Sequence, residues 1–171
     1  LATLAKALVA KEKYPNKRLI KLAGREVRYN SELYLEAITR IQAAQGIKTL
    51  VSEDKKTIPI WLASFLIFKL GLLGGEYITS SHGISVKNAT KDLNSQGGQY
   101  LPEESIEFVD KIHNTINYEP FNFVQNYDFK KDSKLFKGFS YRYNSENDLK
   151  LLFYILNKAY SEYKTLENLF L

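Results

Sequence analysis

Short apolar runs alternate with longer segments of helical periodicity through residues 1–79. Strands are predicted at residues 18–23, 47–51 and 76–79, and helices at residues 1–11, 32–45 and 57–70. A helix between two strands forms a crossover, and crossovers join parallel strands while covering a face of the sheet. The alternation therefore predicts an α/β fold with three layers, α/β/α, whose sheet is mixed but mostly parallel.

Local signals mark the starts of the second and third predicted helices. Asn30 or Ser31 is expected to cap the second helix. Thr57 is expected to cap the third, with Pro59 in its first turn, where the missing N–H costs little. Trp61 belongs to the apolar part of this third helix, so we expect its side chain in the core.

The second half of the chain has weaker periodicity. Residues 80–99 are rich in Ser, Gly, Asn and Lys, which predicts a loop with one short strand at residues 84–87. Beyond them we predict a helix at 102–116, an irregular aromatic-rich segment at 117–140 and an amphipathic helix at 144–166. We interpret residues 1–140 as one domain. Residues 141–171 would be a C-terminal helix that packs on it or leads into a missing next domain.

Composition and charge bear on the partners. The net charge is +5, but the basic residues are scattered and form no known nucleic-acid motif, so we expect no nucleic-acid partner. The longest apolar run, residues 58–73, is shorter than the roughly 20 residues of a membrane span, so we expect a buried helix and no membrane partner. The lack of Cys and of a signal peptide favours a cytoplasmic protein. The lack of Met, even at position 1, indicates either a piece of a longer chain or residues that are missing from the sequence.

A polar loop follows the third predicted strand directly. Residues 79–82 read Thr-Ser-Ser-His, and residues 97–99 read Gly-Gly-Gln just before the acidic start of the next predicted helix. Upstream, Arg28 precedes Asn30-Ser31 at the start of the second predicted helix. Because α/β sheets bind ligands at the carboxyl ends of their strands, Ser81 is a candidate site residue.

These motifs, in this order, resemble the first domain of the phosphohexomutases, the family of phosphoglucomutase and phosphomannomutase. In that family a strand runs into Thr-Ala-Ser-His-Asn-Pro, and a Gly-Gly-Gln segment with an acidic helix start follows. Arg28 with Asn30-Ser31 is similar to the family's Arg-x-Asn-Ser/Gly-Ser segment. Residues 45–48 are similar to the step from its glycine into the second strand. The resemblance covers about residues 18–117.

The resemblance implies a phosphoserine mechanism. Ser81 would carry a phosphoryl group, contact Mg²⁺ through that phosphate, and pass the group to a hydroxyl of a hexose phosphate. His82 would orient the loop or contact the phosphoryl group, and Arg28 would neutralise phosphate charge. Lys87 is the nearest candidate in the sequence for the family's loop lysine. The implied enzyme is an isomerase that interconverts the 1- and 6-phosphates of glucose or mannose. The remaining domains of the polypeptide would be its partners.

The loop also departs from the family pattern. Gly83-Ile84 replaces Asn-Pro after the histidine, and the family's magnesium-binding Asp-Gly-Asp-Gly-Asp-Arg loop, which belongs to a second domain, is absent from this sequence. Two interpretations stay open: a catalytic fragment that is inactive alone, and a catalytically degenerate α/β domain used for binding or interaction. A serine hydrolase is not indicated, because the sequence has no Gly-x-Ser-x-Gly elbow.

Overall fold

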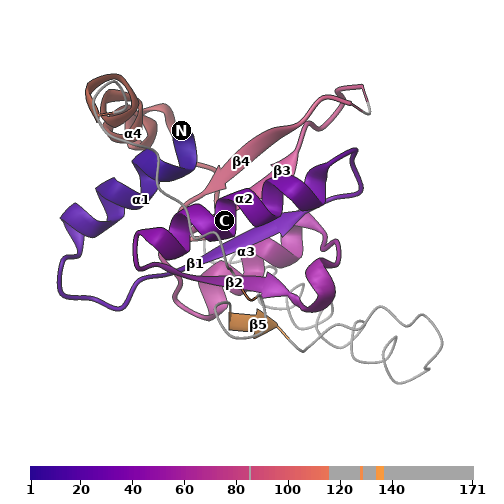
Figure 1. Ribbon diagram of the computed structural model, residues 1–171, viewed down its shortest axis with the longest axis horizontal. Coiled ribbons are helices and arrows are strands. Elements are labelled where there is room, and N and C mark those ends of the chain that lie inside the picture. Colours follow the sequence, from indigo (N-terminus) through magenta and orange to yellow (C-terminus); the bar gives the residue numbers. More distant parts are fainter. Residues whose placement is uncertain (85, 116–127, 129–133, 137–171) are drawn as a thin grey trace, which may run out of the picture. The chain divides into compact units, whose positions relative to one another are not determined.

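The computed structural model describes residues 1–84, 86–115, 128 and 134–136 (Figure 1). Leu1–Gly138 forms one unit and Phe139–Leu171 a second. All the described helices and strands belong to the first unit. The predicted helix at residues 144–166 lies outside the described residues, and so does most of the segment predicted to be irregular.

The described elements alternate along the chain as the sequence predicts. The strands are β1 Ile20–Arg25, β2 Lys48–Ser52, β3 Gly75–Thr79, β4 Ala89–Leu93 and β5 Lys134–Phe136. The helices are α1 Ala2–Lys13, α2 Ser31–Ala44, α3 Ile60–Lys69 and α4 Pro102–Thr115, with a short 3₁₀-helix at Glu53–Lys55.

The sheet has the strand order β4-β3-β1-β2-β5. β1 lies in the centre and pairs in parallel with β2 and β3, so Leu22 stands opposite Leu50 on one side and Gly75 on the other. β5 pairs in parallel with β2, and β4 pairs antiparallel with β3. The predicted mixed, mostly parallel sheet is confirmed.

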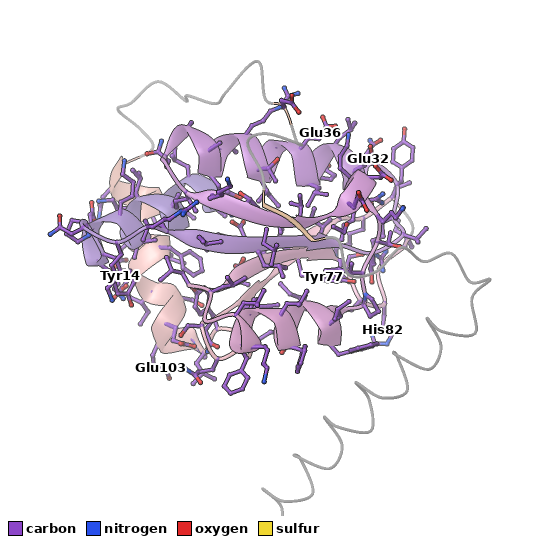
Figure 2. The ribbon with its side chains drawn as sticks, turned by 90° about the horizontal axis from the view of Figure 1, so that it is seen from below. Tyr14, Glu32, Glu36, Tyr77, His82 and Glu103 are labelled. Atoms are coloured by element: carbon purple, nitrogen blue, oxygen red, sulfur yellow. The ribbon has the colours of Figure 1, made fainter. Side chains whose placement is uncertain are left out.

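Helices cover both faces of this sheet. One face packs against α2 through a cluster of buried residues: Ala23, Leu35, Ile38, Val51 and Ile78. Successive strand residues face opposite sides, so Leu22 points to the other face, where Ile67 of α3 and Leu22 both lie against Gly75. Figure 2 shows the sheet, with Tyr77, between two helical layers, one of which carries Glu36. The predicted three-layer α/β/α arrangement is confirmed.

Two strand predictions were wrong. Ile84, Val86 and Lys87 lie outside any strand, and the Lys87 N–H closes a turn onto the Ile84 carbonyl at 2.9 Å. The strand instead begins at Ala89, because antiparallel pairing opposite Thr79 can start only after the chain has turned back. β5 falls within the segment predicted to be irregular, since three residues are too few for a visible periodicity.

The predicted helix starts also needed correction. Asn30 is the N-cap of α2, but its φ of +57° is left-handed and its side chain makes no capping hydrogen bond. α3 begins at Ile60 with Pro59 as N-cap, so Thr57 lies before the helix. Trp61 is 45% exposed, because the buried face of α3 is formed by Leu62 and three later residues: Ala63, Leu66 and Ile67. Within the described residues, no helix combines the length and apolar character that crossing a membrane requires.

The Gly-Gly-Gln segment is tied to α3 through Gly97. Gly97 has a φ of +80°, in the left-handed region that favours glycine. Its carbonyl accepts a hydrogen bond from Ser64 Oγ at 2.5 Å. A Cβ at this position would lie 2.8 Å from Ser64 Oγ and nearer still to the Ser64 carbonyl oxygen. The turn therefore requires glycine for both its conformation and its close approach to the helix.

Gly97→Ala is expected to lower the free energy of unfolding by about 2–4 kcal/mol. A left-handed φ costs an L-residue about 1–2 kcal/mol, and overlap with the Ser64 backbone adds a further term. Urea unfolding followed by circular dichroism measures the change. Gly98→Ala is the matched control, because the nearest atom to its added Cβ is Asn94 Oδ1 at 3.7 Å. Equal losses in the two variants would contradict this account.

Candidate functional site

The Thr-Ser-Ser-His loop begins at the last residue of β3, at the carboxyl edge of the parallel strands. Ser81 is exposed and has a φ of +51°. Its Oγ has no hydrogen-bond partner in the part of the chain that the structure describes. Figure 2 places His82 at this end of the sheet and Tyr14 and Glu103 at the other. The exposed Ser81 hydroxyl therefore lies at the edge where α/β sheets bind ligands.

Arg28 holds the backbone of this loop. Its Nη2 donates to the Ser81 carbonyl oxygen at 2.7 Å, and its Nη1 donates to the carbonyl oxygens of Gly83 and Ile84 at 3.1 and 3.3 Å. Its Nε donates to the Glu26 carboxylate. The Arg28 side chain is only 10% exposed. Arg28 therefore fixes the main chain of the loop, and none of these bonds involves the Ser81 side chain.

Glu26 and Thr79 form hydrogen bonds at the start of the loop. Thr79 Oγ1 donates to Glu26 Oε1 at 2.7 Å and accepts from the Ser81 N–H at 3.0 Å. The Glu26 N–H continues the β1–β3 ladder by donating to the Ile78 carbonyl at 3.1 Å. Desolvation acts to raise the pKa of Glu26, but hydrogen bonds from Thr79 and Arg28 outweigh it and lower the pKa. Glu26 is thus held ionised between its two donors.

His82 and Lys87 take different places around the same loop. His82 is exposed, and none of the described residues hydrogen-bonds its side chain. Lys87 is exposed too, and its Cδ lies 3.2 Å from the point where a Cβ on Gly83 would stand. The Lys87 carbonyl accepts a hydrogen bond from Ser80 Oγ at 2.7 Å. The structure therefore brings Arg28 and Lys87 to the loop of Ser81 and leaves the His82 ring in solvent.

The described residues supply little of a magnesium site. Mg²⁺ takes octahedral oxygen ligands, and Ser81, with or without a phosphate, would provide one of them. The Glu26 carboxylate is already engaged by Thr79 and Arg28. Within the described ranges no three His, Cys, Asp or Glu side chains form a group that could hold a metal. Ser81 could therefore provide one magnesium ligand, and the remaining ligands would have to come from outside the described residues.

Arg28→Lys is expected to loosen the loop while keeping the charge. A single ammonium cannot reproduce the planar set of bonds to three carbonyls and a carboxylate. Hydrogen exchange measured by mass spectrometry should show the Ser81 and Gly83 amides exchanging about tenfold faster or more. The control is Arg40→Lys, because a 3.9 Å ion pair with Glu36 is the one interaction that the described residues offer the Arg40 side chain. Unchanged protection in Arg28→Lys would show that the clamp is dispensable.

Sequence reasoning did not assign roles to Glu26 or to Thr79. The available signal was their position, since Glu26 follows β1 directly and Thr79 ends β3. Neighbouring parallel strands bring their carboxyl ends together, so polar residues at both ends are placed to meet.

Two family models match the chain in succession. The model described as phosphoglucomutase/phosphomannomutase, alpha/beta/alpha domain I, matches residues 2–120. A second, described as a protein of unknown function (DUF2400), matches residues 103–171. The first match contains all the residues of the site described above, and the two overlap only at residues 103–120.

Curated relatives agree with the first match. The chain is 30% identical over 98 residues to a phosphomannomutase of Mycoplasma genitalium, covering 57% of the chain and 18% of the relative. It is 33% identical over 107 residues to a phosphoglucomutase of Staphylococcus saprophyticus, and this match covers 59% of the chain and 19% of the relative. The chain thus spans about a fifth of the length of these relatives.

Solved structures share the fold. One assigned as a phosphomannomutase from Thermus thermophilus superposes with a TM-score of 0.56 at 22% identity, covering 65% of this chain and 25% of that one. The phosphoglucomutase parafusin from Paramecium, in its open form, superposes with a TM-score of 0.59 at 17% identity. The match covers 75% of this chain and 24% of parafusin. With the domain I match over most of its length, the chain belongs to the phosphoglucomutase/phosphomannomutase family.

Proposed function

We propose that this chain is the phosphoserine-bearing domain of a hexose-phosphate mutase and that Ser81 is its phosphoryl carrier. One observation carries the proposal: Ser81 presents an exposed hydroxyl, unbonded by any described residue, on a backbone held by Arg28 and Thr79. Phosphoryl transfer depends mainly on positioning and charge neutralisation, and a fixed backbone with a free side chain suits the first of these.

The proposed cycle uses Ser81 twice. The phosphoryl group leaves Ser81 Oγ as it bonds to a hydroxyl of the hexose phosphate, which gives a hexose bisphosphate. After the sugar turns over, its other phosphoryl group returns to Ser81 Oγ, and the isomeric monophosphate leaves. A bound Mg²⁺ would supply neutralisation of the phosphate charge, with Ser81 as one point of attachment.

Arg28 and the remaining loop residues would support these transfers. The second N–H of Arg28 Nη2 has no acceptor among the described residues, so it is available to an oxygen of a phosphate on Ser81. Its other bonds make Arg28 a positioning residue as well. His82 and Lys87 are exposed beside the loop, where their side chains can turn toward a phosphate.

The complete reaction would require the rest of the polypeptide. The chain spans about a fifth of its curated relatives, so sugar binding and the other magnesium ligands would come from further domains. The domain division at residue 140 stays a prediction. The domain I match ends at residue 120, and the first structural unit ends at Gly138.

Phosphopeptide mapping tests the proposal directly. The full-length protein, incubated with a hexose 1,6-bisphosphate and Mg²⁺, should yield a peptide phosphorylated on Ser81. Ser80 is the internal control, because its Oγ donates to the Lys87 carbonyl and it lies in the same peptide. Phosphate on Ser80 alone, or on neither serine, would reject Ser81 as carrier.

A catalytically degenerate binding domain is the second candidate. It is favoured by Gly83-Ile84 in place of the family's Asn-Pro and by the use of most Arg28 donors on loop carbonyls. For this candidate, the folded full-length protein would take up no phosphate from the bisphosphate. The same mapping experiment therefore separates the two.

A further inference from the structure

A cavity of about 420 Å³ lies at the amino-terminal edge of the sheet, opposite to the Ser81 loop. Tyr14 and Glu103 line it, and Figure 2 shows both at the end of the sheet opposite to His82. Its described walls come from α1, the start of β1, the segment before β3, the segment between β4 and α4, and α4 itself. The proposed phosphoserine chemistry makes no use of this space.

Lys21 of β1 lines this cavity and is 3% exposed. No other described residue forms a hydrogen bond with its ammonium group, although buried charged groups are ordinarily bonded. Lys6 is the contrast within the same cluster. Its Nζ donates to Glu76 and Asp92, both at 2.6 Å.

The Glu76 carboxylate, which attracts Lys21, is hydrogen-bonded to other residues. Both Glu76 oxygens are engaged, Oε2 by Thr3 and Lys6 and Oε1 by Gln42. Lys21 therefore interacts with Glu76 only at longer range. Burial lowers the pKa of Lys21, attraction to Glu76 opposes this, Lys6 lowers the pKa further, and Asp92 on β4 acts to raise it. The net direction is downward, toward a neutral amine.

The rest of the lining favours an uncharged, flat ligand. The apolar and aromatic part of the wall consists of Val9, Ala10, Tyr14, Leu73, Tyr100 and Phe108. Three glutamates of α4 also contribute: Glu104 bonds the Leu101 N–H and Asn94, Glu107 pairs with Lys13, and Glu103 completes the set. Lys6 and Lys13 line the cavity beside Lys21, so the three glutamates leave the described lining without a net positive charge that would attract an anion.

We propose that Lys21 is a carbonyl-reactive amine and that the cavity binds a small, uncharged aromatic aldehyde as an imine with it. The reaction is a condensation. The neutral Nζ adds to the carbonyl carbon to give a carbinolamine, whose hydroxyl leaves as water while nitrogen loses its proton, and a C=N bond replaces C=O. Electrons are not transferred to or from an outside reagent. Burial and a neighbouring cation, here Lys6, are both settings in which lysine acts as a nucleophile.

The probe is salicylaldehyde, applied to the folded chain at neutral pH, with borohydride added to reduce and trap the imine. Peptide mapping should find the reduced adduct on Lys21 at more than about ten times its yield on Lys13. A lowered pKa leaves Lys21 a larger neutral fraction, and only the neutral amine adds to a carbonyl. Lys13 lines the same cavity but is 51% exposed. Labelling in urea should abolish the preference.

Variants separate this proposal from the phosphoserine function. Lys21→Arg removes the primary amine and should remove the adduct, whereas Lys13→Arg and Ser81→Ala should leave Lys21 labelling unchanged. Equal labelling of Lys21 and Lys13 in the folded wild-type chain would overturn the proposal. That comparison uses wild-type protein alone, so it holds even if Lys21→Arg does not fold. Pyridoxal 5′-phosphate, an anionic aldehyde, should label Lys21 less than salicylaldehyde does, and the reverse order would overturn the preference for an uncharged ligand.

Discussion

Ser81→Ala in the full-length protein is expected to reduce hexose-phosphate mutase turnover by at least about a thousandfold. The reason is that the substitution removes the only atom proposed to hold the phosphoryl group between the two transfers, and losing a covalent nucleophile costs at least this much. A coupled assay of 1-phosphate to 6-phosphate conversion measures the effect. Stability should change by less than about 0.5 kcal/mol, because the side chain is exposed and makes no described hydrogen bond.

Ser80→Ala is the matched control for this loss. Ser80 Oγ donates to the Lys87 carbonyl, so its removal perturbs the same loop without touching the proposed carrier. We expect it to retain turnover within about tenfold of wild type, since a single neutral hydrogen bond contributes about 1 kcal/mol. Full activity in Ser81→Ala would refute the carrier role, and equal losses in both variants would assign the effect to loop structure.

Glu76→Gln is expected to destabilise the chain by about 3–5 kcal/mol. Glu76 is 1% exposed and accepts hydrogen bonds from Thr3, Lys6 and Gln42. Removing one partner of a buried ion pair leaves the other charge buried without compensation, which is the costly case. Lys6 would keep Asp92 as its one carboxylate partner among the described residues, and Lys21 would lose its attraction to Glu76. Urea unfolding at pH 7 measures the loss against a typical total of about 5–15 kcal/mol.

The pH dependence of Glu76 provides a second test. Burial acts to raise its pKa, but the charges of Lys6 and Lys21 outweigh this and hold the pKa below the ordinary 4.5. A lowered carboxylate pKa contributes stability that is present above the unfolded-state pKa and is lost as pH falls through the folded-state value. The difference in free energy of unfolding between wild type and Glu76→Gln should therefore become smaller below about pH 4.5. Glu107→Gln is the exposed-pair control, with an expected change under about 0.5 kcal/mol.

Much of the fold could be predicted because its signals are local. Strand-length apolar runs, helix periodicity and the glycines between them are properties of neighbouring residues, and they located β1, β2, β3 and α1 to α4 within a few positions. β4 was misplaced because its five residues Ala89–Leu93 have little apolar alternation, and antiparallel pairing with β3 decides where it begins. Trp61 was assigned to the core because composition does not reveal which side of an apolar helix faces the sheet.

The sequence by itself determined the order of elements and the placement of Ser81 after the third strand, since both follow from short-range pattern. Only the tertiary structure decided the partners: Arg28 meets the carbonyls of Ser81 and Gly83, and Glu76 meets Lys6 from far along the chain. The physical reason is that strand register and helix packing set which side chains share a face. Hydrogen bonds, buried charges and the cavity beside Lys21 depend on that three-dimensional arrangement rather than on sequence spacing.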